Sequence, residues 1–205
     1  MEMASLVFFF IIIVPSAIIH EYMHGWMANR CGDPTAKHEG RLTLNPLAHI
    51  DLWGTIIMPL TLFAFSGGRF LFAYAKPVPV NPMFLKGKYA GIYVAIAGPL
   101  ANFATAGVIG GLIRILPPSA FASILGLIVY ANVLLGVFNL IPIPPLDGSK
   151  VLLPLLPASM DNFKDNMERY GFFILLGFIF IVGFQWVLPI IFSIYYLLTG
   201  APLPF

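Results

Sequence analysis

Four long apolar stretches decide what this chain can fold into. They cover residues 4–28, 88–114, 121–141 and 170–198, and each is long enough to cross a bilayer, which takes about 20 apolar residues. Because the bilayer core offers no water to backbone N–H and C=O groups, we expect each stretch to be helical. The last stretch is interrupted near Pro189, so it is either one tilted helix or two shorter ones.

Composition supports a membrane protein. Of the 205 residues, 59% are hydrophobic and 10% are charged, whereas a soluble domain carries about 25% charged residues. The chain lacks the polar surface of a soluble protein, so we expect the lipid bilayer to be its environment. A net charge of +2 without a basic cluster argues against a nucleic-acid partner. The single cysteine, Cys31, excludes an internal disulfide and a cysteine-based zinc site.

The region between the first two long stretches is irregular. Residues 53–65 are apolar but too short for a span, which favours a re-entrant or interfacial segment. Residues 40–50 and 69–80 alternate in polarity, so we expect two strands near the membrane surface. The charged stretch 159–170 predicts a short surface helix before the last span.

The predicted fold is therefore a single domain that covers residues 1–205. It is an all-α polytopic membrane protein with about four to six transmembrane helices. A small membrane-associated β element lies between the first two long helices.

Basic residues indicate the orientation in the membrane. If residues 53–65 dip into the bilayer and return, the basic side chains around them share one side, which the positive-inside rule makes cytoplasmic. The first helix then runs from outside to inside and ends toward the cytoplasm. These basic residues are Arg30, Lys37, Arg41, Arg69, Lys76, Lys86 and Lys88.

The stretch HEYMH places ionisable groups at the end of the first apolar run, where such groups are costly without a task. His20 and His24 are four residues apart and share one helical face, so both can reach one ion. Imidazole is a good zinc ligand, and Glu21 can act as general base on a water whose pKa zinc lowers to about 7. The alternative is that the histidines only form hydrogen bonds with neighbouring helices.

A catalytic zinc site needs three protein ligands and one open position, so a third ligand is required. Asp147 stands out because it lies between two apolar segments in NLIPIPPLDGSK, where three prolines interrupt the helix. An aspartate in such a break can be a buried ligand or a turn residue that caps the next helix, and the pattern leaves both open. Of the other histidines, His49 is interpreted as interfacial and His38 as a solvated loop residue.

Three asparagines also lie in apolar stretches: Asn102, Asn132 and Asn139. Polar side chains in membrane bundles commonly form interhelical hydrogen bonds. The functional alternative is a contact to the substrate backbone or to an oxyanion near the zinc. Spacing alone favours the interhelical interpretation.

Taken together, these motifs resemble the site-2 protease family of intramembrane zinc metalloproteases, in its compact prokaryotic branch. The similarity covers about residues 8–150 and is carried, in order, by HEYMH, GRLTLNPLAHID, AKPVPVNP, AGPLAN and NLIPIPPLDG. The resemblance implies one zinc ion per chain, held by His20, His24 and Asp147, with Glu21 as the catalytic base.

The resemblance also extends to substrate and location. It implies that Asn102 and Asn139 lie near the active site, in substrate binding or oxyanion stabilisation, while Asn132 keeps its interhelical interpretation. The segments 40–50 and 69–80 resemble membrane-associated β elements that hold substrate as an extended strand. The implied activity is cleavage of transmembrane segments of membrane-anchored regulatory proteins in a prokaryotic plasma membrane. We expect neither a PDZ domain between the spans nor a regulatory CBS domain after them, although many relatives carry one.

Three rival functions remain at this stage. A divalent-metal transporter could use the same three ligands, but transport pathways use more carboxylates than these apolar stretches contain. A catalytically silent relative that only binds membrane helices is at odds with the intact Glu21. A purely structural zinc site would need a fourth protein ligand such as His49. The sequence carries no signal for the oligomeric state.

Overall fold

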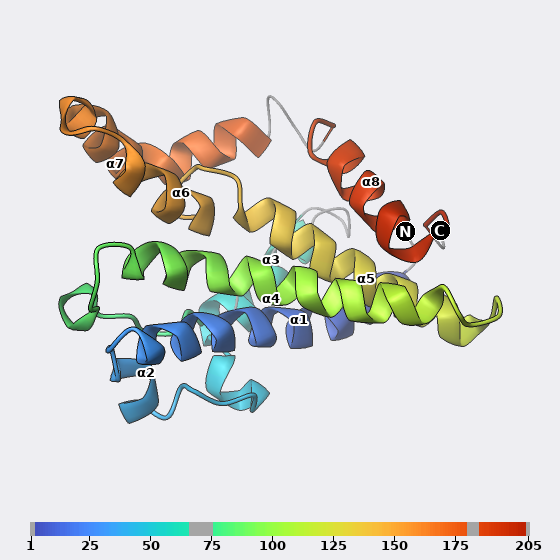
Figure 1. Cartoon of the computed structure of the whole chain (residues 1–205). Helices are drawn as coiled ribbons and strands as arrows, with labels where there is room; N and C mark the ends of the chain where they lie inside the picture. The colour runs from blue at the N-terminus through green and yellow to red at the C-terminus, as the bar shows by residue number, and fades with distance from the viewer. Residues whose placement is uncertain (1–2, 66–75, 180–184, 204–205) are drawn as a thin grey trace.

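The computed structural model describes residues 3–65, 76–179 and 185–203. In these ranges every regular element is a helix, and none is a strand (Figure 1). The all-α part of the prediction is therefore confirmed. The α-helices are α1 Met3–Arg30, α2 Thr35–His38, α3 Met58–Phe65, α4 Ala90–Ile113, α5 Ala120–Asn139, α6 Asp147–Leu152, α7 Asp161–Gly177 and α8 Leu188–Thr199.

Helices α1, α4 and α5 form the centre of the bundle. Helix α4 packs against both α1 and α5, and these two also contact each other. Helix α8 packs on α4 and α5, and the short helix α6 packs on α4. The core between α4, α5 and α8 is built from Ala106, Val129, Val133, Ile191 and Tyr195, all fully or almost fully buried.

Two helices among the described residues, α4 and α5, are long and apolar enough to cross a membrane. The bundle also exposes large apolar side chains on its outside, among them Val108 of α4, Phe121 of α5 and Phe173 of α7. Water-soluble monomers rarely expose so much apolar surface. Length, composition and surface therefore agree with helices that face lipid.

The strand predicted over residues 40–50 is wrong. This segment forms turns and a short 3-10 helix, Pro46–His49. The Asn45 side chain accepts a hydrogen bond from the Leu47 N–H, which starts that helical turn. Of the second predicted strand, residues 69–75 lie outside the described residues, and residues 76–80 have no regular secondary structure. A backbone hydrogen bond from Lys76 N–H to His49 O, at 2.9 Å, joins the described parts of the two segments.

The predicted surface helix over residues 159–170 is not a separate element. Helix α7 runs from Asp161 to Gly177 without a break, so the charged stretch and the start of the last apolar stretch form one helix. Gly171 lies where the two meet, and a β-carbon built there would come within 2.4 Å of the Pro144 side chain. Its missing side chain thus lets α7 pack on the chain break before α6. Helix α8 follows, so the described residues contain two helices in this region.

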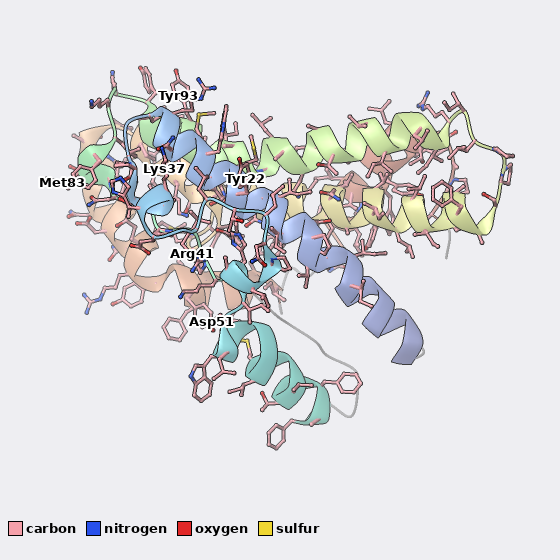
Figure 2. All side chains as sticks on the ribbon, turned by 90° about the horizontal axis from the view of Figure 1, so that it is seen from below. Tyr22, Lys37, Arg41, Asp51, Met83 and Tyr93 are labelled. Carbon is pink, nitrogen blue, oxygen red and sulfur yellow. The ribbon has the colours of Figure 1, made fainter. Side chains whose placement is uncertain are left out.

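Residues 52–65 are helical, as a π-helical segment Leu52–Ile57 continued by α3. The Asp51 side chain accepts a hydrogen bond from the Gly54 N–H at 2.7 Å and starts this segment. Figure 2 shows α3 extending away from the bundle, beyond the labelled Asp51. Trp53 of the π-helical segment and Phe65 of α3 are both exposed. Such an apolar arm matches the short, non-spanning segment that the sequence favours.

Candidate metal centre

His20 and His24 lie one turn apart on α1, in the centre of the bundle. Both side chains are buried, at 5% and 8% exposure. Their rings pack edge to face with centroids 4.6 Å apart, and the two Nε2 atoms are 2.9 Å apart. The four-residue spacing therefore brings both imidazoles to one point, as expected for one helical face.

Asp147 reaches the same point from the far part of the chain. Its Oδ2 atom lies 3.0 Å from Nε2 of His20 and 3.0 Å from Nε2 of His24. Its other oxygen, Oδ1, accepts from Nζ of Lys150 at 3.2 Å. Asp147 is the first residue of α6, and Leu146 is its N-cap. The sequence left open whether Asp147 is a buried ligand or a turn residue that caps the next helix. In the structure its side chain is buried and points into the bundle, as the first interpretation requires.

The hydrogen bonds behind the histidines determine which ring nitrogens carry protons. Nδ1 of His24 lies 2.7 Å from the carbonyl oxygen of Val94, which can only accept, so this nitrogen donates. Nδ1 of His20 lies 2.7 Å from Oδ1 of Asn102 and donates in the same way. In the neutral rings both Nε2 atoms therefore present lone pairs to each other and to the Asp147 carboxylate. Three converging electron donors repel one another unless a cation lies among them.

The donor set and the space around it fit zinc. Two imidazole nitrogens and one carboxylate oxygen, with a fourth position open, are a catalytic zinc ligand set. Zinc bonds of about 2.0–2.1 Å in tetrahedral geometry separate ligand atoms by about 3.3 Å, close to the 2.9–3.0 Å observed here. Among the described residues, these three are the group whose ligand atoms lie close enough to share one metal.

Gly98 of α4 leaves the space for such an ion. A β-carbon built at Gly98 would lie 2.4 Å from Nε2 of His24 and 2.7 Å from Nε2 of His20. No other residue type fits there, because real β-carbons do not approach other atoms so closely. The sequence contained a signal, since glycine inside an apolar helix costs stability and needs a reason. The sequence prediction nevertheless missed this residue.

Glu21 lies beside the three groups and is bound to the segment that precedes α4. Its side chain is half-buried, and Oε2 accepts a hydrogen bond from the Val78 N–H at 2.8 Å. Glu21 directly follows the candidate ligand His20 in the chain. Its carboxylate is held in place by the backbone N–H of Val78.

The segment that contains Val78 is anchored at both ends. The guanidinium of Arg41, which is buried, donates from Nη2 to the carbonyl oxygens of Lys76 and Pro77 at 2.8 and 3.2 Å. At the other end, the Asn81 N–H donates to Oδ2 of Asp33 at 2.6 Å. Figure 2 shows Arg41 below α1. These contacts fix the backbone that binds Glu21.

Asp33 is a carboxylate clamp between two loops. It is fully buried, and burial alone would raise the pKa of its carboxyl group. The hydroxyl of Thr35 and the N–H groups of Asn81 and Thr35 all donate to it, and together they hold its pKa below the ordinary value. Asp33 therefore stays charged at neutral pH and ties the loop after α1 to the segment before α4.

The asparagines differ in their relation to this centre. Asn102 is fully buried behind His20, and both N–H groups of its amide are used, by Ser16 O and by Asn132 Oδ1. It has no donor left for an oxyanion, so the geometry favours support of His20 over substrate contact. Asn139 is half-buried at the end of α5 and donates to Leu135 O within its own helix. Asn132 forms the interhelical hydrogen bonds expected of it, and one of them leads to Asn102.

The remaining histidines lie apart from the centre. His49 is buried, and its Nε2 is 2.8 Å from the carbonyl oxygen of Thr43 in the same loop. It does not belong to the metal-ligating group found among the described residues, so it offers no fourth ligand there. His38 is the exposed last residue of α2. Cys31 is a free, half-buried thiol.

Similar sequences are known for most of the chain. Residues 108–182 match the sequence profile of peptidase family M50. Over 178 residues the chain is 36% identical to "Putative zinc metalloprotease YwhC" of Bacillus subtilis, which covers 81% of this chain and 77% of that protein.

Two further relatives carry the same description. Rip2 of Mycolicibacterium smegmatis is 30% identical over 78% of this chain and 62% of its own length. MJ0611 of Methanocaldococcus jannaschii is 32% identical over 66% of this chain and 63% of its own length. The chain thus spans less than two thirds of these two relatives. No solved structure gives a significant match.

Proposed function

Because the chain belongs to peptidase family M50 and is a zinc metallopeptidase, we propose that it cleaves transmembrane segments of membrane-anchored regulatory proteins within the bilayer. The observation that carries this proposal is the convergence of two imidazole nitrogens and one carboxylate oxygen within 3.0 Å inside an apolar helix bundle. Buried ionisable groups of this kind are costly in hydrocarbon and point to a function.

In this proposal His20, His24 and Asp147 hold the zinc ion. When bound, zinc polarises the scissile carbonyl and lowers the pKa of water into the neutral range. The hydrogen bonds from Nδ1 of each histidine orient its Nε2 lone pair toward the ion. Lys150 occupies Oδ1 of Asp147, which leaves Oδ2 as the ligand atom.

Glu21 is proposed as the general base. Its Oε1 atom accepts a proton from the attacking water as the water oxygen bonds to the carbonyl carbon. Glu21 then gives this proton to the amide nitrogen as the peptide C–N bond breaks, so the carboxylate is restored. The Val78 N–H on Oε2 fixes the carboxylate during both transfers. A substrate helix has to unwind locally first, because its own hydrogen bonds shield the peptide bond.

We predict that Glu21→Gln keeps zinc and that its cleavage rate falls by about 10²–10⁴-fold. This is the usual contribution of a positioned acid–base group to the rate. Zinc content and cleavage of a model transmembrane helix should be measured on the same purified sample. Glu39→Gln is the matched control, since Glu39 is exposed and should behave as wild type. Cleavage by Glu21→Gln at the wild-type rate would contradict the role of Glu21.

The membrane arrangement is part of the same proposal. We propose a single-domain, multi-pass protein of the plasma membrane with about four to six spans. The HEYMH end of α1 lies toward the cytoplasm. The support comes from α4 and α5, which are long enough to span, and from the basic residues that gather before α4.

Cysteine labelling tests this orientation. Single cysteines at Lys37 and Lys88, both exposed, should react with a membrane-impermeant thiol reagent only from the cytoplasmic side. A cysteine at Ala120 serves as the control, because the turn between α4 and α5 lies at the other end of the bundle (Figure 1). This position should react from outside. The background is Cys31→Ala, and labelling of Lys88→Cys from outside would refute the orientation.

A further inference from the structure

Behind the candidate metal centre, a chain of hydrogen bonds joins three helices. We propose that Asn132 of α5 is a positioning residue that fixes the tautomer and orientation of His20 through Asn102. The inference rests on the proposed function in one respect: it takes His20 as a zinc ligand through Nε2.

The series of hydrogen bonds starts at two groups, the Ser16 hydroxyl and the Ile128 carbonyl, that can only accept from Asn132. The hydroxyl of Ser16 donates its one proton to the carbonyl oxygen of Ile12 at 3.1 Å, so toward Asn132 this oxygen can only accept. The amide nitrogen of Asn132 lies 2.9 Å from that hydroxyl oxygen and 2.9 Å from the carbonyl oxygen of Ile128. Both N–H groups of Asn132 are thus fixed, and its Oδ1 has to face Asn102.

The same logic then fixes Asn102. Its amide nitrogen lies 2.9 Å from Oδ1 of Asn132 and 3.1 Å from the carbonyl oxygen of Ser16. Both partners accept, so the NH₂ group of Asn102 has to face them and its Oδ1 has to face His20. At 2.7 Å from Nδ1, this oxygen accepts a proton from His20, and the Nε2 lone pair is left for the metal.

The two histidines show why His20 needs this support. His24 donates to the carbonyl oxygen of Val94, a backbone acceptor that cannot turn around. His20 donates to a side-chain amide, which could present NH₂ in place of oxygen after a rotation of about 180°. Because Asn102 and Asn132 are fully buried and Ser16 is 3% exposed, bulk water does not compete for these hydrogen bonds. Asn132 therefore determines which face of Asn102 meets His20.

Zinc affinity of the apoprotein tests this inference. We expect Asn132→Leu to weaken zinc binding by about 10-fold and Asn102→Leu by about 10–100-fold, the range for groups that orient metal ligands. Asn132→Asp keeps an Oδ1 acceptor for the NH₂ group of Asn102, so it should bind zinc nearly as wild type does. The control is Thr105→Val on α4, because the Thr105 hydroxyl donates to Ala101 O within its own helix.

A double variant tests whether Asn132 acts on His20 through Asn102 or whether the two asparagines affect zinc binding independently. Since Asn132 acts through Asn102, the Asn102→Leu/Asn132→Leu variant should bind zinc no more weakly than Asn102→Leu alone. Affinity is measured by competition with a chelator, and circular dichroism confirms that each variant is folded. If Asn132→Leu does not fold, Ser16→Ala is used, which removes one acceptor of Asn132 and should weaken zinc binding severalfold.

Three outcomes would overturn the inference. They are unchanged affinity in the folded Asn132→Leu or Ser16→Ala variant, equal weakening by Asn132→Asp and Asn132→Leu, and additive losses in the double variant. Failure of the proposed function gives a different result, because His20→Ala would then bind zinc as tightly as wild type.

Discussion

At the scale of single residues, the candidate centre depends on an absent side chain as much as on its ligands. Gly98 allows α4 to approach α1 so closely that any β-carbon would enter the space between the two Nε2 atoms. The residue contributes no chemistry of its own. It makes room for an ion that three electron donors require.

Gly98→Ala is therefore expected to abolish zinc binding while the bundle stays folded. The added methyl group overlaps the ion's position, and at 2.4 Å from a ring nitrogen it also forces the histidines apart. Bound zinc can be measured by elemental analysis of the purified protein. Gly107→Ala is the matched control on the same helix, because a β-carbon there meets no atom within 4 Å. A zinc content near wild type in Gly98→Ala would show that the ion lies elsewhere.

The sequence predicted some of these residues and not others for a physical reason. The spacing of His20 and His24 is a property of one helix, so it could be recognised locally. The convergence of Asp147 needed the resemblance to a family, because a break after three prolines fits a turn equally well. A glycine inside an apolar helix is a local signal at Gly98, but the signal does not say what the glycine faces. That contact and the hydrogen bonds of Asn132 depend on how α4 and α5 pack against α1, which no local pattern contains.

At the scale of elements, the segment 76–81 is the part that the sequence described least well. The alternation of polar and apolar residues predicted a strand that continues up to residue 80. Pro77, Pro79 and Pro82 have no N–H group to donate to a ladder. The segment is instead held by side chains, chiefly Arg41 and Asp33. The helices were easier to predict, because long apolar runs leave few alternatives.

Arg41→Lys should reduce cleavage by at least about tenfold and leave zinc affinity unchanged. The lysine ammonium ends one atom nearer the backbone than Nη2 and lies on a flexible stem. It should hold the carbonyl oxygens of Lys76 and Pro77 less well, so the Val78 N–H that holds Glu21 should shift. Small displacements of catalytic groups are known to cost large factors in rate. Arg30→Lys is the control, since Arg30 is exposed and stacks on Trp26. A wild-type cleavage rate in Arg41→Lys would show that Glu21 does not depend on this clamp.

At the scale of the whole molecule, the candidate centre connects parts of the chain that are far apart. His20 and Asp147 are separated by 127 positions, and α4 packs on both elements that carry them. The sequence could not predict the number of spans, because the apolar stretches end in short or broken segments. The charged residues of helix α7 all lie in its first half, and its second half is apolar. The helical segment at residues 52–65 is too short to be classified as a span by length alone.

Removal of zinc is expected to loosen the whole bundle. A ligand that binds only the folded state stabilises it by about 4 kcal/mol at a thousandfold excess over its dissociation constant. A chelator should therefore lower the temperature at which the wild type unfolds in detergent. The Asp147→Ala variant lacks the side chain that joins α6 to the histidines of α1. The chelator should therefore change its unfolding temperature little. Equal shifts in both proteins would show that the stabilising metal is bound at another place.

The distance between the ligands along the chain also has a consequence during synthesis. The ribosome makes α1 first, and the translocon can release it into the bilayer long before Asp147 has been polymerised. Until then the nascent chain carries His20, Glu21 and His24 of the candidate centre but not Asp147. The candidate centre can assemble only after Asp147 has been made and α6 has packed into the bundle. Under the proposed function, a nascent copy therefore has no complete centre with which to cleave membrane proteins until Asp147 has been translated.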